Sequence, residues 1–180
     1  MNKQEVKEWI LAIFIGFILV FGFKALIATN YHIIGESMMP TLSNKDRVIV
    51  SKLSSLERTD IVIFRSGEED FVKRVIGLPG DTIRYENDQL FINGKYIEEP
   101  FLQSYSEYKQ PEIKFTEDFE LQELTGSKQV PKDKVFVLGD NRLSSLDSRH
   151  FSFVDKEDIV GVVKARYWPI SDMTIYLHSE

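Results

Sequence analysis

The sequence contains no cysteine, only three histidines and no excess of positive charge. The lack of cysteine excludes disulfides and thiolate metal sites, and it is compatible with either side of a membrane. The formal net charge of -6 argues against nucleic acid as a partner, because nucleic-acid-binding domains usually carry a basic face. No metal-ligand spacing or phosphate-binding loop is evident, so we expect neither a metal nor a cofactor. The 180 residues, 43% of them hydrophobic, suffice for one domain and an appendage.

A long apolar stretch lies near the amino terminus. Residues 9–23 are all apolar or glycine, and the extended stretch 9–28, interrupted by a single lysine, has 20 residues, about the number that spans a bilayer. A cleaved secretory signal has a shorter apolar segment, of roughly 7–15 residues, and a small-residue exit site that residues 28–30 do not resemble. We therefore expect a permanent single-pass anchor. Two lysines among the first seven residues favour a cytoplasmic amino terminus and an extracytoplasmic remainder.

Short β-branched runs bounded by polar turns follow this stretch, and they predict a mainly β fold with an antiparallel-sheet core. The predicted strands are 47–51, 60–64, 71–76, 83–85, 90–92, 95–97, 135–138 and 159–168. Asn93-Gly94 is the preferred dipeptide of a type I′ hairpin. On strand 71–76, period-two alternation places Lys73 and Arg74 on opposite, mostly apolar faces, so we expect one of the two cations to be poorly solvated.

The segment 98–134 differs in character from the strands around it. It contains nine acidic residues, five lysines and three prolines and shows poor periodicity, so we interpret it as an inserted, solvated lobe. The expected organisation is a cytoplasmic tip (1–8), a transmembrane helix (9–28), a β-rich catalytic core (31–97 and 135–170), the inserted polar lobe (98–134) and a carboxyl-terminal tail (171–180).

A serine-containing stretch, Gly35–Leu42, precedes the first predicted strand. It reads Gly-Glu-Ser-Met-Met-Pro-Thr-Leu and combines a permissive glycine with a proline that blocks helix formation. Taken alone, this pattern is also that of an ordinary turn. Such an irregular segment can hold the Ser37 hydroxyl at the rim of an apolar surface, with Met38 as an adaptable contact.

Two kinds of group are able to activate the Ser37 hydroxyl. His150 with Asp147 would give a Ser-His-Asp arrangement, but nothing beside His150 marks it as a base. The alternative is a neutral lysine, whose pKa falls readily when its side chain is desolvated. Lys73, on an apolar strand face, is the candidate. Its pKa would need to fall to about 8 for it to act near neutral pH.

Three stretches occur in order along the chain: Gly35–Leu42, Val72–Asp81 and Gly139–Arg149, the last reading Gly-Asp-Asn-Arg-Leu-Ser-Ser-Leu-Asp-Ser-Arg. Together they resemble the type I signal peptidases, the membrane-anchored Ser/Lys proteases that remove signal peptides from exported proteins. The resemblance runs from the apolar stretch to about Trp168. It implies a serine endopeptidase that cleaves after small residues in Ala-x-Ala-like sites, with signal-peptide-bearing preproteins and the lipid bilayer as partners.

The resemblance also implies roles for individual residues. Ser37 matches the nucleophile and Lys73 its general base. Ser145 matches the serine that hydrogen-bonds and orients the lysine. Asp147 and Arg149 match a supporting pair that holds the loop 139–149 against the site.

Further positions match residues that contact the substrate. Ile33, Val72 and Met38 match the lining of shallow pockets for small side chains at substrate positions -1 and -3. The backbone N–H of Ser37 would form part of an oxyanion hole. Gly35 stands where some members carry a hydroxyl that completes the hole, so a second donor would have to come from backbone or water.

Two other classes of protein share part of this pattern. One is a catalytically silent, membrane-tethered β module that binds exported chains, which would lack the serine or the lysine. The other is a self-cleaving Ser/Lys repressor, which would need a DNA-binding helix-turn-helix where this chain has an apolar stretch. No motif predicts an oligomeric state.

Overall fold

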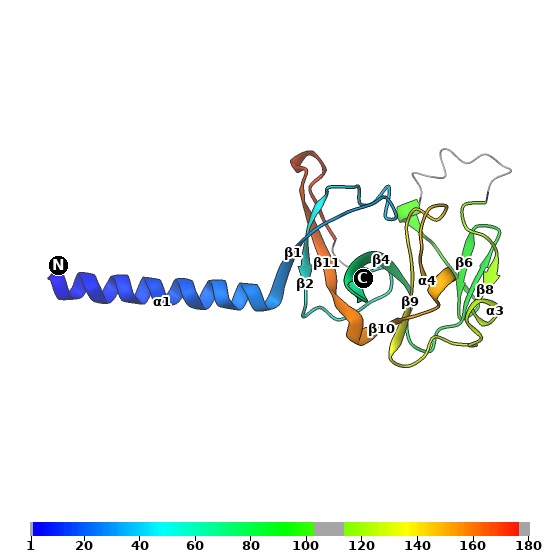
Figure 1. Cartoon of the computed structure of the whole chain (residues 1–180), viewed down its shortest axis with the longest axis horizontal. Coiled ribbons are helices and arrows are strands. Elements are labelled where there is room, and N and C mark those ends of the chain that lie inside the picture. The colour runs from blue at the N-terminus through cyan, green and yellow to red at the C-terminus, as the bar shows by residue number, and fades with distance from the viewer. Residues whose placement is uncertain (1, 103–113, 177–180) are drawn as a thin grey trace.

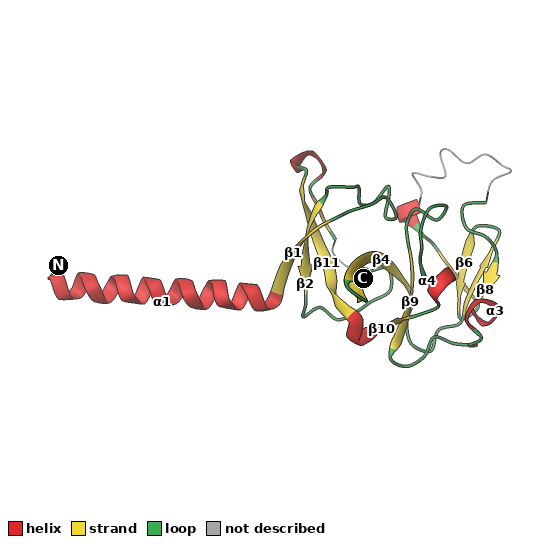
Figure 2. Ribbon diagram, viewed as in Figure 1, coloured by secondary structure: helices red, strands yellow, loops and turns green. Residues whose placement is uncertain are grey.

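A computed structural model of the chain describes residues 2–102 and 114–176. The long helix α1 (Lys3–Ile27) leads into strand β1 and projects away from two β-sheets (Figure 1). Strands and loops make up most of the remaining chain (Figure 2). The mainly β, antiparallel fold class predicted from the sequence is confirmed. Part of the predicted polar lobe, residues 103–113, lies outside the described residues, as do residues 177–180 of the predicted tail.

No helix in residues 2–102 and 114–176 meets the combined length and hydropathy expected of a membrane span. The transmembrane helix expected over residues 9–28 therefore stays a prediction.

The larger sheet contains eight antiparallel strands in the spatial order β1-β2-β11-β3-β4-β9-β10, with β12 paired to β11. Their bounds are β1 (Ala28–His32), β2 (Arg47–Ser51), β3 (Ile61–Ser66), β4 (Glu69–Gly77), β9 (Lys134–Leu138), β10 (Val154–Asp155), β11 (Ile159–Trp168) and β12 (Thr174–Ile175). Short helices connect the strands of both sheets: η1 (Pro100–Leu102), α3 (Leu121–Thr125), α4 (Ser148–Phe151), η2 (Lys156–Asp158) and η3 (Ile170–Asp172).

The smaller sheet contains four strands in the order β7-β6-β5-β8. They are β5 (Ile83–Glu86), β6 (Gln89–Ile92), β7 (Lys95–Ile97) and β8 (Phe119–Glu120). Asn93 and Gly94 join β6 to β7 with φ values of 52° and 77°, so this hairpin has the type I′ turn that the dipeptide predicts. The sheets divide between β4 and β5, and β8 comes from the segment 98–134. The predicted limits of the domains stay an interpretation.

Three strands carry apolar side chains on both faces and separate three hydrophobic clusters. On β3, Ile61 and Ile63 pack in one cluster, whereas Val62 and Phe64 pack in another. The strands β4 and β9 divide their side chains between clusters in the same way. Burial on both faces explains why these strands read as continuous apolar runs instead of alternating ones. It also leaves little water beside any polar side chain on them.

Close approach of β11 to β2 requires a residue without a side chain. A Cβ at Gly161 would lie 2.4 Å from the carbonyl oxygen of Ser51, which is backbone. A Cβ at Gly77 would lie 2.4 Å from Cδ1 of Ile83, the movable end of a side chain.

We therefore expect Gly161→Ala to lower the free energy of unfolding by about 3 kcal/mol and Gly77→Ala by about 1 kcal/mol. The first change forces two strand backbones apart, whereas the second requires mainly a rotamer change. Urea denaturation followed by circular dichroism measures both values. A larger loss for Gly77→Ala than for Gly161→Ala would contradict this account of the sheet.

Candidate active site

The side chains of Ser37 and Lys73 meet between two segments that are distant in sequence. Ser37 lies in the turn after β1, and Lys73 lies on β4. The Lys73 Nζ donates a hydrogen bond to Ser37 Oγ at 2.8 Å and another to the carbonyl oxygen of Val72 at 2.9 Å. Lys73 pairs across the sheet with Val62, so its stem lies on the face of β4 that packs on an apolar cluster. Only 3% of Lys73 is exposed.

This burial lowers the pKa of the lysine amine. Desolvation lowers the pKa of the Lys73 amine from 10.5 to about 8, although the charges of Asp147 and Asp140 act to raise it. Among the described residues Lys73 forms no ion pair, because each of the two carboxylates is bound to an arginine. The amine is therefore able to lose its proton near neutral pH and to accept one from the hydroxyl it contacts.

The neighbouring cation, Arg74, is also buried, but it has a carboxylate partner. The sequence led us to expect one poorly solvated cation, and the structure buries both, at 3% and 6% exposure. Arg74 forms a two-point ion pair with Asp140, with distances of 2.8 Å from Nε to Oδ1 and 2.6 Å from Nη2 to Oδ2. It also donates to the carbonyl oxygen of Thr59 and to Oγ1 of Thr41. Arg74 thus joins three loops around the site.

The loop 139–149 rests directly on the serine turn. The N–H of Asn141 donates to the carbonyl oxygen of Ser37 at 3.0 Å, and its side-chain amide donates to that of Glu36 at 3.2 Å. A Cβ at Gly139 would lie 2.1 Å from Ser145 Oγ and 2.6 Å from the Ser37 carbonyl oxygen. Only glycine allows this contact between the two segments.

Asp147 and Arg149 form an ion pair inside the same loop. Arg149 donates from Nε and Nη2 to the two carboxylate oxygens at 2.8 and 2.9 Å, and the N–H of Gly139 donates to Asp147 at 3.0 Å. Burial acts to raise the pKa of Asp147, but the hydrogen bonds and charge of Arg149 outweigh it, so the pKa is lowered. Ser145 Oγ is buried and meets the geometric criteria for a hydrogen bond with none of the described residues, although it lies close enough to Asp147 to help lower the pKa of that carboxyl. The bond from Ser145 to the lysine is therefore not formed in this structure, and its orienting role stays a prediction.

A second arginine of this loop ties it to the smaller sheet. Arg142 donates from Nε to the carbonyl oxygen of Gly139 at 3.0 Å and forms a buried ion pair with Glu99. It also donates to the hydroxyls of Tyr85 and Thr116. Burial raises the pKa of Glu99, although Arg142 acts to lower it. The smaller sheet therefore contributes to holding the loop.

The predicted pocket residues Ile33, Val72 and Met38 lie together. They pack in one hydrophobic cluster, and each is less than a tenth exposed. Two of them are the sequence neighbours of Ser37 and Lys73, so the cluster borders the pair. His150, in contrast, is exposed on α4, while the serine hydroxyl contacts the lysine. The geometry does not favour the Ser-His-Asp alternative.

Arg166, like Glu99, is a supporting residue that the sequence analysis does not identify. From β11, its Nη1 donates to the carbonyl oxygen of Thr41 at 3.1 Å and pairs with Asp46 at 2.9 Å. These contacts fix the end of the serine turn. Its partners are 125 and 120 residues away, so no local pattern could have identified it.

The chain matches known proteins over nearly its whole length. The family model described as "Signal peptidase, peptidase S26" matches residues 6–168. Signal peptidase I of Bacillus caldolyticus is 47% identical over 179 residues, which cover 94% of this chain and 96% of that protein. Signal peptidase IB of Staphylococcus aureus (strain COL) is 42% identical over 179 residues, covering 94% and 93%. A crystal structure of signal peptidase I from Enterococcus faecalis V583 is 42% identical, with a TM-score of 0.58 over 61% of this chain and 97% of that chain.

Fold, site and matches together define a class, that of the serine peptidases, which are hydrolases of peptide bonds. Within that class, the chain belongs to the signal peptidase family, peptidase S26. The resemblance drawn from the three sequence motifs is confirmed.

The lowered pKa of Lys73 predicts an unusual stability profile for Lys73→Met. The unfolded chain binds this proton more tightly, so the folded wild type carries a penalty of about 3 kcal/mol below pH 8. The penalty shrinks as the pH rises from about 8 towards 10.5 and is absent above it. The variant also loses the hydrogen bonds to Ser37 and Val72, which reduces its gain in stability by about 1 kcal/mol. We expect the variant to be more stable at pH 7 by about 2 kcal/mol.

Urea midpoints at pH 7 and pH 10.5 measure this difference, and the gain should vanish at the higher pH. Lys52→Met, which changes an exposed lysine, is the matched control and should alter neither midpoint appreciably. If Lys73→Met proves less stable than wild type at pH 7, Lys73 is a charged structural lysine.

Proposed function

We propose that this chain removes signal peptides from exported preproteins with Ser37 as nucleophile and Lys73 as general base. The observation that carries the proposal is the 2.8 Å hydrogen bond from a desolvated amine to the serine hydroxyl. Neutral Lys73 takes the hydroxyl proton as Ser37 Oγ attacks the scissile carbonyl. The amine then gives that proton to the leaving amino group, and it next activates the water that hydrolyses the acyl-enzyme.

The negative charge on the attacked carbonyl oxygen needs hydrogen-bond donors. The N–H of Ser37 donates no hydrogen bond to any described residue, which supports its assignment as one donor of the oxyanion hole. Gly35 has no side chain to offer a second donor, so backbone or water supplies it.

An extended substrate has an edge to pair with beside Lys73. The strand β9 pairs with β4 only at Arg74, Val75 and Gly77, so within the described chain residues 69–73 pair with β3 alone. An unpaired strand edge is a site for adding a polypeptide in extended form. The adjoining cluster of Ile33, Met38 and Val72 supports shallow apolar pockets, and we infer cleavage after Ala-x-Ala-like sequences.

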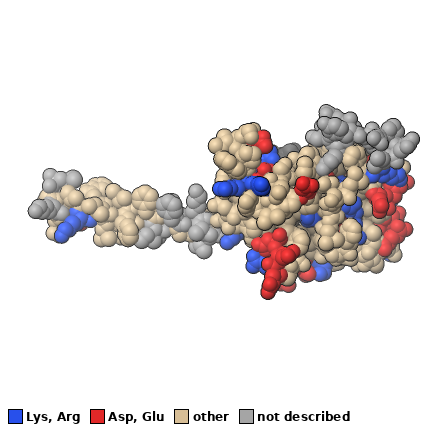
Figure 3. Space-filling model, turned by 45° about the horizontal axis from the view of Figure 1, so that its top comes forward, with Lys and Arg blue, Asp and Glu red and all other residues tan. Residues whose placement is uncertain are grey.

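A lipid bilayer is the partner proposed for α1. The helix carries exposed apolar side chains at Trp9, Ile10, Leu11, Ile13, Phe14, Ile15 and Phe17. Because these positions are nearly consecutive, they lie all round the helix, a pattern that needs an apolar surrounding. Most of the described surface of α1 in Figure 3 carries no charge. We propose a single membrane pass with the amino terminus in the cytoplasm and the peptidase on the outer side.

Further apolar side chains are exposed where β11 turns into β12, at Trp168, Ile170, Met173 and Ile175. This turn belongs to the same sheet as β1, into which the helix leads (Figure 1). A bilayer that surrounds α1 would also cover this turn, and would hold the serine turn near the membrane surface.

Ser37→Ala should fold normally and cleave at less than about a thousandth of the wild-type rate, because no other group replaces the covalent step. The substrate is a model precursor with Ala-x-Ala before the cut, and mass spectrometry locates the cleaved bond. Ser55→Ala, at an exposed serine, should retain activity. Cleavage by Ser37→Ala above that level would identify another nucleophile. A wild type that binds the precursor without cutting it would indicate a silent binder.

Removal of α1 should lower cleavage of membrane-embedded precursors without abolishing cleavage of soluble peptides. A chain that starts at Ala28 keeps β1, which pairs with β2 along its length, and should still cleave short soluble peptides. Its rate on precursors embedded in liposomes should fall at least about tenfold relative to the full chain, because tethering supplies effective concentration. Equal rates of the two chains on the embedded precursor would remove the support for a membrane-positioned site.

A further inference from the structure

An aromatic cavity lies on the same face of β4 as the Lys73 side chain. It has a volume of about 450 Å³ and is lined by Phe64, Phe71, Leu146 and Phe151. Phe71 is two residues from Lys73 on β4, about 7 Å along a strand, and successive side chains alternate between faces. Leu146 belongs to the loop 139–149. The cavity therefore adjoins the candidate active site, and the catalytic steps do not use it.

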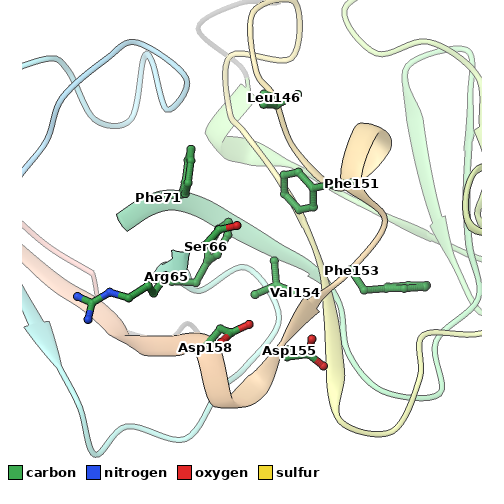
Figure 4. A pocket seen from close by; sticks show the side chains of 10 residues that line it. Arg65, Ser66, Phe71, Leu146, Phe151, Phe153, Val154, Asp155 and Asp158 are labelled. Carbon is green, nitrogen blue, oxygen red and sulfur yellow. The ribbon is translucent and has the colours of Figure 1, made fainter. Parts of the chain in front are cut away.

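The two ends of the cavity differ in chemistry. In Figure 4, Phe71, Phe151 and Leu146 lie at one end, and the carboxylates of Asp155 and Asp158 lie at the other. The ring of Phe64 is 5.8 Å from that of Phe71 and 6.1 Å from that of Phe151, so the aromatic end forms a continuous wall.

The charged groups around the cavity leave one carboxylate in excess. The guanidinium of Arg65 points away from the other lining residues and is paired with Asp70 at 2.7 Å. Asp155 is paired with Lys134 at 2.6 Å. Within the described residues, Asp158 has no ion pair, and it is exposed on η2. A long aliphatic side chain with a cationic end matches an aromatic wall that leads to a free carboxylate.

We propose that this cavity is a subsite for a lysine or arginine side chain of the polypeptide substrate, within about two residues of the cut bond. The inference rests on the proposed peptidase activity and adds a preference that the small-residue pockets do not supply. Since the residues at -1 and -3 must be small, positions -2, +1 and +2 are the ones that can present such a side chain. The aliphatic stem lies against Phe71 and Phe151, and the cationic end reaches Asp158.

The test compares peptides with Ala-x-Ala before the cut that carry lysine, norleucine or alanine at one of these three positions. Norleucine keeps the stem without the charge. With the full chain in detergent micelles, we expect kcat/KM at one position to be about three- to tenfold higher for lysine than for norleucine. The same change at position +5 should have no effect. Ratios within one enzyme are insensitive to differences in the folded fraction between variants.

Two variants assign the preference to the cavity. Asp158→Asn should bring the lysine to norleucine ratio to about one, whereas Glu157→Gln, which changes the adjacent acid of η2 outside the cavity, should preserve it. Phe151→Ala should lower the ratio of norleucine to alanine, because the stem loses its wall.

Equal cleavage of lysine and norleucine peptides at all three positions, or a preference that survives Asp158→Asn, would overturn the subsite while leaving the peptidase intact. Failure of the wild type to cleave any peptide would instead contradict the proposed function, and the subsite with it.

Discussion

The desolvation of one lysine amine is the constraint on which the rest of the site depends. Lys73 lies on a strand with apolar clusters on both faces. The two carboxylates whose charges act on its amine, Asp140 and Asp147, are paired with Arg74 and Arg149. A free carboxylate beside the amine would stabilise its charged form and raise its pKa. The arginines therefore do more than hold loops together, because they also leave Lys73 without a counter-ion, so that desolvation lowers its pKa to about 8.

Arg74 and Arg142 hold the segments around Ser37 and Lys73 together. Arg74 reaches the loops before β3, after β9 and at the serine turn, and Arg142 connects the loop after β9 to the smaller sheet. Rigid positioning of a nucleophile and its base within hydrogen-bond distance is a main source of rate in such sites. The smaller sheet, which supplies neither Ser37 nor Lys73, thus contributes to their geometry through Tyr85 on β5.

Much of the fold was predictable because most of its strands are β-branched or apolar runs bounded by polar turns. Every predicted strand is present, with ends shifted by at most two residues. Four strands were missed. The two-residue strands β8, β10 and β12 depend on tertiary neighbours and carry no pattern of their own. The five-residue strand β1 reads Ala-Thr-Asn-Tyr-His, which is no β-branched run, and it follows the apolar helix directly. Ser37 and Lys73 were found from local chemistry, a constrained turn and a cation on an apolar strand. Arg166 and Glu99 were not, because their partners come from other parts of the chain.

The support of the serine turn by late segments has a consequence for biosynthesis. Ser37 and Lys73 both lie in the first half of the chain, whereas Asn141 and Arg166, which hold the serine turn, are 105 and 125 residues from their partners in that turn. Contacts of such large sequence separation form slowly, after most of the chain entropy has been lost. A nascent chain therefore exposes both residues well before the segments that hold them together have been synthesised.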